Sequence, residues 1–192
     1  MKAKVASILF STAVIAGCSS KTTQVPEPAQ KQVTLFEFMT QKIDKDADVI
    51  WGIGNKAIDN NASLDPSLMS EADWTRLKEA AGRMGTDARA LAAVDKLIVK
   101  PQGVSIADEG TPGAPTTAEI EGHIGRDHDL FRSLAGALAG HADELASASA
   151  KRDSVKAARL INELDGVCES CHLEFWYPEQ KKIIQQMGIK TR

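Results

Sequence analysis

One stretch near the C-terminus, residues 153–178, reads DSVKAARLINELDGVCESCHLEFWYP. Its apolar side chains recur every three or four residues, which predicts an amphipathic helix with one buried face. That face comprises Val155, Ala158, Ile161, Leu164, Cys168, Cys171 and Phe175. The helix is expected to begin near Asp153 and to end before Pro178, because proline cannot continue a normal helix.

The buried face of this predicted helix runs into the five residues Cys168-Glu169-Ser170-Cys171-His172. Cys-x-x-Cys-His is the attachment signature of a c-type haem. At 3.6 residues per turn, positions 168, 171 and 172 fall within about 100° of one another. Two thiols on one face can form thioethers with the porphyrin vinyl groups, and the adjacent imidazole can ligate the iron. We therefore expect one covalent haem c, attached through Cys168 and Cys171 with His172 as the proximal ligand.

Three other interpretations of the motif compete with haem attachment. A zinc site would need two more ligands, normally a second Cys-x-x-Cys or a histidine pair, and the sequence has neither. A thioredoxin-like redox pair would begin a helix within a βαβ pattern, and no such alternation occurs here. Chance is the third, and it is improbable for a chain with three cysteines in 192 residues.

The N-terminus predicts export. Residues 1–17 have a basic start, an apolar run and small residues at the end, which is the pattern of a secretory signal peptide. The apolar run is shorter than the roughly 20 residues that a transmembrane helix needs. The last four positions before and at the cysteine, Ile-Ala-Gly-Cys18, resemble the lipobox of bacterial lipoprotein signals. This resemblance implies cleavage before Cys18 and lipidation of Cys18; an ordinary signal peptide cut elsewhere is the alternative.

The rest of the chain then divides into two parts. Residues 18–32 are rich in Ser, Thr, Pro and Gln and are expected to form a flexible tether behind the lipid. Residues 33–192 suit a single domain. Without Lys2 and Lys4, the mature chain has 21 basic and 26 acidic side chains, a formal net charge of −5, which argues against a nucleic-acid partner.

Three further amphipathic helices precede the last one. The first is expected over residues 34–59, with Asp46 interrupting its apolar stripe. The second is expected to start after Ser70 as N-cap and to end at Pro101, and residues 101–115 form a Pro- and Gly-rich crossover. The third starts after Thr116 or Thr117. No alternating pattern suggests a sheet, so the sequence predicts an all-α fold, an antiparallel four-helix bundle with haem on the last helix.

A helical bundle with Cys-x-x-Cys-His on its last helix resembles the cytochrome c′ family. The resemblance covers residues 34–178 in architecture, with a weaker likeness at Phe36-Glu37-Phe38-Met39. After His172 the chain departs from the Cys-His-x-x-Phe/Tyr-Arg ending common in that family. It is more similar there to small exported haem proteins whose motif is followed by Trp-Tyr-Pro.

The resemblance implies that a residue of the first helix faces the iron. In the family this residue is apolar or aromatic, which leaves the iron five-coordinate, or a methionine, which makes it six-coordinate. Met39 is the candidate distal ligand, and ordinary core packing is its alternative role. Phe36, Phe38 and Phe175 are candidate haem-wall residues, with plain core packing again the alternative. The remaining histidines, any of which could instead be a sixth ligand or a surface residue, are His123, His128 and His141.

Two classes of function follow from these expectations. The first is a lipid-anchored electron carrier that faces the periplasm and exchanges electrons with a redox partner protein of the cell envelope. Ser19, the residue after Cys18, favours the outer membrane by analogy with enteric bacteria. The second is a five-coordinate protein that binds small gases such as NO or CO. A haem enzyme would need a distal acid-base pair, which the sequence does not mark, so no enzyme activity is expected. A homodimer is compatible with either class.

Overall fold

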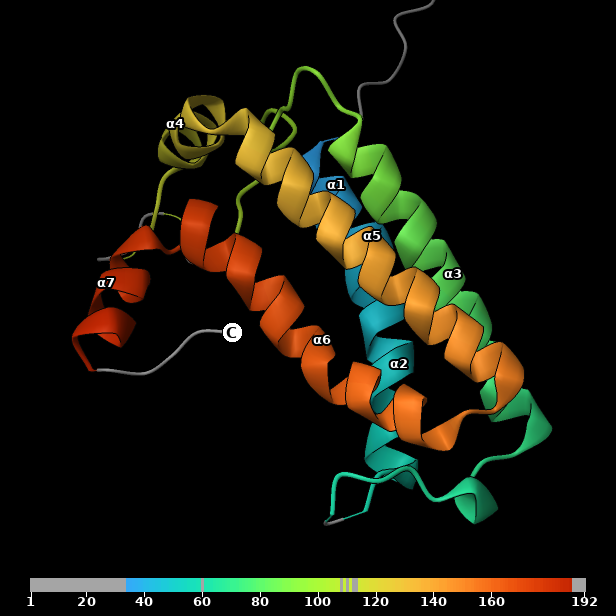
Figure 1. Cartoon of the computed structure of the whole chain (residues 1–192). Helices are drawn as coiled ribbons and strands as arrows, with labels where there is room; N and C mark the ends of the chain where they lie inside the picture. Colours follow the sequence, from blue (N-terminus) through green and yellow to red (C-terminus); the bar gives the residue numbers. More distant parts are fainter. Residues whose placement is uncertain (1–33, 60, 108, 110, 112–113, 188–192) are drawn as a thin grey trace, which may run out of the picture. The chain divides into compact units, whose positions relative to one another are not determined.

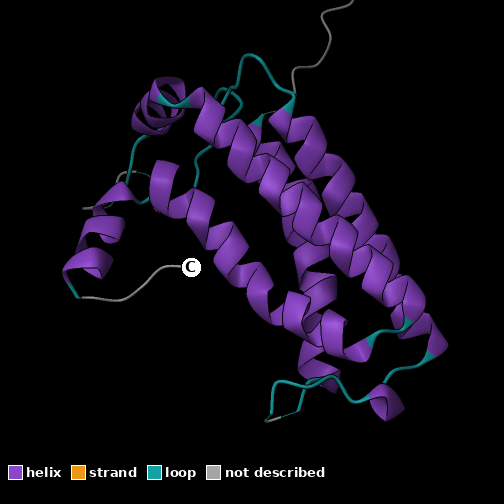
Figure 2. Ribbon diagram, viewed as in Figure 1, coloured by secondary structure: helices purple, strands orange, loops and turns teal. Residues whose placement is uncertain are grey.

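The computed structural model describes residues 34–187 except residues 60, 108, 110, 112 and 113 (Figure 1). Within these residues the chain forms helices and loops, with one isolated β-bridge and no strand (Figure 2). In chain order the helical elements are α1 (Leu35–Phe38), the π-helical turn η1 (Met39–Ile43), α2 (Asp44–Ala57), the 3₁₀ helix η2 (Pro66–Leu68), α3 (Glu71–Ala92), α4 (Thr117–Arg126), α5 (His128–Lys151), α6 (Ser154–Phe175) and α7 (Pro178–Gln186). The predicted all-α class is confirmed. The predicted signal peptide 1–17 and tether 18–32 lie outside the described residues.

The predicted first helix contains a π-helical turn that the apolar periodicity did not indicate. Thr34 caps the helix, because its hydroxyl accepts the Glu37 N–H at 3.2 Å and the Glu37 carboxylate accepts the Thr34 N–H at 3.0 Å. From α1 to α2 the buried positions follow three- or four-residue spacing except between Phe38 and Ile43, which are five residues apart. The turn η1 occupies this interval.

The second helix starts as predicted and ends early. Ser70 caps α3, since its hydroxyl accepts the Asp73 N–H at 3.2 Å. The helix stops at Ala92, so the predicted end at Pro101 is wrong. The residues in between turn back to α1: the carbonyl oxygens of Ile98 and Val99 accept the N–H groups of the first two α1 residues, each at 2.8 Å. Tertiary hydrogen bonds of this kind leave no trace in helical periodicity.

The predicted third helix is two helices, α4 and α5, separated at Asp127. Thr116 caps α4, as expected. Asp127 leaves the helical conformation, with φ −141° and ψ 65°, and its carboxylate accepts the Leu130 N–H at 3.0 Å as the N-cap of α5. Aspartate favours such a local side-chain bond over helix continuation. The apolar stripe continues across the break because Ile124 and Phe131 remain buried.

The predicted fourth helix is α6, capped by Asp153, whose carboxylate accepts the Lys156 N–H at 3.0 Å. Val155, expected on the buried face, is 79% exposed, so that assignment is wrong: Val155 lies in the first turn, ahead of the packed part of the helix. After α6 ends, Pro178 begins a further helix, α7, which the sequence analysis did not predict. Proline suits a first helical turn because the N–H it lacks would have no partner there.

The long helices α2, α3, α5 and α6 lie side by side, with α3 packed along α5 and α6 packed against both α5 and α2 (Figure 1). Two core clusters result. The first core cluster lies between α2, α3, α5 and α6 and includes Ile50, Leu77 and Leu164. The second core cluster joins α1, the end of α3, α4, the start of α5 and the end of α6, and includes Phe38, Ile120, Phe131 and Phe175. No helix in the described part of the chain is both long and apolar enough to cross a membrane.

Candidate functional site

The last turns of α6 bring Cys168, Cys171 and His172 to the same internal space. One cavity of about 280 Å³ is lined by Cys171 and His172, and a second of about 250 Å³ by all three residues. Both cavities are lined mainly by apolar side chains. The residues that they share are Met39, Thr40, Phe131, Cys171 and His172. We refer to the two cavities together as the site.

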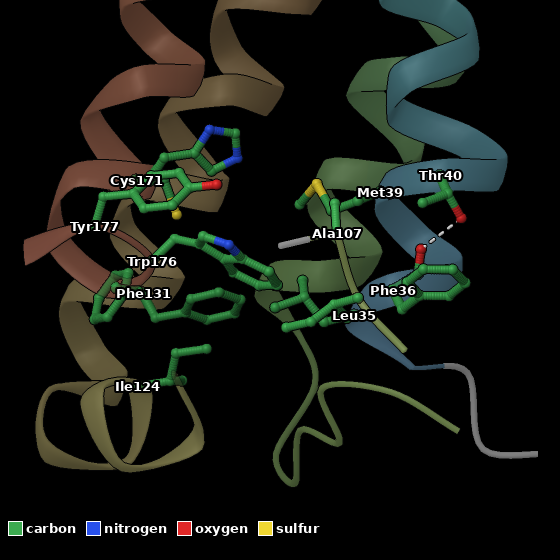
Figure 3. Close-up of a pocket in the computed structure, with 13 residues that line it drawn as sticks. Leu35, Phe36, Met39, Thr40, Ala107, Ile124, Phe131, Cys171, Trp176 and Tyr177 are labelled. Atoms are coloured by element: carbon green, nitrogen blue, oxygen red, sulfur yellow. Dashed lines mark hydrogen bonds between the residues drawn. The ribbon is translucent and has the colours of Figure 1, made fainter. Parts of the chain in front are cut away.

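Met39 lies across the first cavity from the cysteine motif (Figure 3). Its side chain extends from η1 into the cavity, whereas Cys171, Trp176 and Tyr177 approach from the opposite side. Met39 also packs against both core clusters, while Cys168 packs against the first and Cys171 against the second. The site is therefore the place where the two core clusters meet.

The end of α6 closes the first cavity with two aromatic residues. The N–H groups of Trp176 and Tyr177 both donate to the carbonyl oxygen of His172, at 2.8 and 2.7 Å. This shared acceptor turns the chain immediately after the motif, so that both rings line the same cavity as His172. The second cavity extends towards α2, where Trp51 and Asp44 complete its wall.

Both thiols are held in their protonated form at neutral pH. Burial, followed by the nearby carboxylates of Asp165 and Asp44, raises the pKa of Cys168 to about 11. Burial, followed by the neighbouring Cys168, raises the pKa of Cys171 to about 12. A redox-active cysteine usually has a lowered thiol pKa, which helix N-termini and cationic neighbours provide. This pair lies near carboxylates at the opposite end of its helix, which does not fit that role.

The imidazole of His172 is held neutral. Burial lowers its pKa, against the opposing effect of the Glu169 and Asp165 carboxylates. A neutral imidazole keeps a nitrogen lone pair that can ligate a metal. His172 thus offers one nitrogen ligand, and the described residues contain no group of three or more His, Cys, Asp or Glu side chains that could hold a metal ion by themselves. A structural zinc ion takes four such ligands.

The three other histidines do not line the site. His123 Nδ1 lies 2.9 Å from the carbonyl oxygen of Phe175, and His141 Nε2 lies 2.8 Å from that of Leu160. Because a carbonyl can only accept, these nitrogens carry the proton. Both histidines therefore tie a neighbouring helix to α6. The ring of His128 stacks on Phe131, with ring centroids 6.2 Å apart.

Of the three predicted haem-wall residues, two line the site and one does not. Phe36 and Phe175 line the first cavity. Phe38 lies instead in the second core cluster, with the Lys42 ammonium 4.9 Å from its ring centroid, and lines neither cavity. Thr40 and Tyr177 were not predicted to line the site. The apolar pattern gave no signal for Thr40, because Met39 and Ile43 keep a regular four-residue spacing.

Comparison with known proteins finds no family model, curated protein or solved structure that matches the chain. The features of the chain that bear on function are the side chains of Cys168, Cys171, His172 and Met39 and the cavities that they line.

Proposed function

We propose that this protein is a c-type cytochrome, anchored by lipid in the bacterial cell envelope, that transfers single electrons. The observation that supports the proposal is the common lining of one apolar site by Cys168, Cys171 and His172 from one side and Met39 from the other. An apolar site with a few polar groups in fixed positions is the usual form of a cofactor pocket.

The residues present fit a covalent haem. Cys168 and Cys171, which both line the second cavity, would each supply one thiol for a thioether bond. His172 supplies a neutral nitrogen for one axial position. The rings of Phe131 and Trp176 provide apolar walls. When bound, the haem supplies an iron that alternates between Fe(III) and Fe(II).

Met39 distinguishes between the two classes of function. Its thioether sulfur is a soft ligand that favours Fe(II) and raises the reduction potential. If His172 and Met39 both held the iron, no ligand position would be left for a substrate or gas, which favours electron transfer over the five-coordinate gas-binding alternative. The same reasoning supports the absence of enzyme activity.

We also propose the architecture and location that the sequence predicts. In this proposal α2, α3, α5 and α6 are the four helices of an antiparallel bundle, and α6 carries the haem as the last helix does in the cytochrome c′ family. Cys18 carries the lipid, which holds the protein on the periplasmic face of the outer membrane. Its partner is a redox protein of the same compartment.

Covalent attachment is tested by haem staining after denaturing electrophoresis. The full-length wild-type protein should stain, Cys168→Ser and Cys171→Ser should each stain much more weakly, and the double variant should not stain. Glu169→Gln, which keeps the spacing of the motif, is the matched control and should stain like the wild type. Denaturation-resistant haem in the double variant would refute the assignment.

The choice between carrier and gas binder is tested by the absorption spectrum of the ferrous protein with and without CO. A spectrum that CO leaves unchanged supports the electron carrier. Rapid formation of a CO complex by the wild type would instead support the gas-binding alternative.

A further inference from the structure

The turn η1 is a π-helical interruption in an otherwise α-helical segment. The Asp44 N–H donates to the carbonyl oxygen of Met39, five residues earlier, where an α-helix would use the residue four positions earlier. One extra residue is therefore accommodated between α1 and α2. Such turns occur frequently at functional sites, and Met39 is the first residue of this one.

The sequence itself selects the π-helical register. Phe38 and Ile43 are both buried and are five residues apart, so a regular α-helix would place Lys42, four residues after Phe38, on the same face as Phe38. Burial of an unpaired ammonium group is costly. In the structure, Lys42 Nζ lies outside the core, 2.6 Å from Asp87 Oδ1 on α3 and 4.9 Å from the centre of the Phe38 ring. These two contacts hold the Lys42 ammonium outside the core, where the π-helical turn places it.

Two consecutive residues of η1 line the site. Met39 and Thr40 both line both cavities, as the consecutive residues Cys171 and His172 of α6 do from the opposite side. The Thr40 hydroxyl donates to the carbonyl oxygen of Phe36 at 2.8 Å, so its hydrogen is used within the helix (Figure 3). The Met39 sulfur is therefore the candidate ligand atom that η1 contributes to the site.

We propose that η1 is the positioning element for the distal side of the site, and that Lys42 is the positioning residue that holds its register. In the π-helical register Met39 lines the same cavities as His172, where its sulfur would ligate the iron of a bound haem. A continuous α-helix would rotate α2 relative to α1 by about 100°, which would move the Met39 sulfur away from that place. The inference rests on the proposed function, because it assigns a role to η1 only if haem is bound.

The test removes the extra residue. Gln41 is exposed, and its deletion places Phe38 and Ile43 four residues apart, which permits a continuous α-helix. We expect the holoprotein lacking Gln41 to keep covalent haem, to lose the weak far-red sulfur-to-iron absorption band of His/Met haems, and to bind CO rapidly. The control is Gln41→Ala, which keeps the chain length and should keep the band.

A second variant avoids any change in chain length. Lys42→Leu removes the charge that opposes the α-helical register, so the band should be partly lost and CO binding should appear in proportion. This variant decides the question if deletion of Gln41 lowers the helical circular dichroism or the haem content.

The outcomes separate this inference from the function on which it rests. A wild-type holoprotein without the band would overturn both Met39 ligation and the role of η1. A band present in the wild type and fully retained in folded Lys42→Leu and in the Gln41 deletion would overturn the role of η1 alone.

Discussion

Asp46 and Arg83 form an ion pair that ties α2 to α3. Arg83 Nη2 lies 2.7 Å and Nε 3.1 Å from Asp46 Oδ1. The Asp46 side chain is 8% exposed, whereas that of Arg83 is 56% exposed and covers it. This pair accounts for the carboxylate that interrupts the apolar stripe of the first helix.

Breaking the pair should therefore destabilise the protein. We expect Arg83→Ala to lower the free energy of unfolding by about 1–3 kcal/mol, because it leaves a buried carboxylate without its partner. Lys78→Ala, which removes an exposed charge of the same helix, should change it by less than about 0.5 kcal/mol. Urea unfolding followed by circular dichroism measures both. Equal effects of the two substitutions would contradict the interpretation of Asp46.

Glu109 should make stability depend on pH in the acid range. Hydrogen bonds from the Lys100 ammonium and then from the Thr117 hydroxyl lower the pKa of Glu109 from about 4.5 to about 2. A lowered carboxyl pKa stabilises the fold above the unfolded-state pKa, and this contribution is lost as the pH falls from about 4.5 through about 2. Glu109→Gln should therefore be less stable than the wild type at pH 7, and the difference should shrink as the pH approaches 2.

The control for this effect is Glu79→Gln, an exposed carboxylate on α3. Its stability should follow the wild-type curve throughout. Parallel curves for Glu109→Gln and the wild type, measured as unfolding free energy between pH 7 and pH 2, would show that Glu109 contributes nothing to the pH dependence.

Met39→Ala should convert the iron from six to five ligands while the haem stays covalently bound. The expected changes are loss of the sulfur-to-iron band, a lower reduction potential and rapid CO binding, because a soft ligand that favours Fe(II) is removed and a cavity is left beside the iron. Met69→Ala is the matched control, since Met69 is buried in the first core cluster away from the site. An unchanged spectrum in Met39→Ala would refute Met39 as the distal ligand.

Cys18→Ala should release the protein from the membrane or leave it unprocessed. The wild type should stay with the membrane in high salt and partition into detergent, because burial of acyl chains is not screened by ions. Ser20→Ala, two residues further along, should behave like the wild type. Fractionation with immunoblotting measures this, and a wild-type protein recovered wholly in the soluble fraction would rule out the lipid anchor.

Helix starts could be predicted from the sequence better than helix ends. Ser70, and Thr116 or Thr117, were predicted as caps because a capping side chain bonds to the backbone two or three residues later. The start near Asp153 was predicted without its capping role. The early end of α3 depends on hydrogen bonds between residues about 63 positions apart, such as that from the Leu35 N–H to the Ile98 carbonyl, and no local pattern encodes them. The break at Asp127 arises from a local side-chain hydrogen bond. It was not predicted, because the apolar periodicity continues across it.

The motif residues of the candidate site could be predicted from the sequence more readily than the other residues that line its cavities. The spacing of the motif alone selects Cys168, Cys171 and His172 as candidate residues. Met39 became a candidate through the family resemblance and its place on the first helix. Tyr177 enters the first cavity because α6 ends in a turn with a shared acceptor, which is a feature of backbone geometry and not of residue type. Exposure of Val155 likewise depends on where packing begins along α6.

The position of the site between the two core clusters has a consequence for folding cooperativity. Each cluster has its own packed residues, and Met39 is one of the few side chains that touch both. A molecule that fills the site would contact both clusters at once and stabilise the state in which they are joined. Without it, we expect the helix ends around Cys171 to open at lower free energy than the rest of the protein. If haem is attached as proposed, such opening would give the attachment machinery fuller access to the half-buried thiols of Cys168 and Cys171, and the attached haem would then hold the two clusters together.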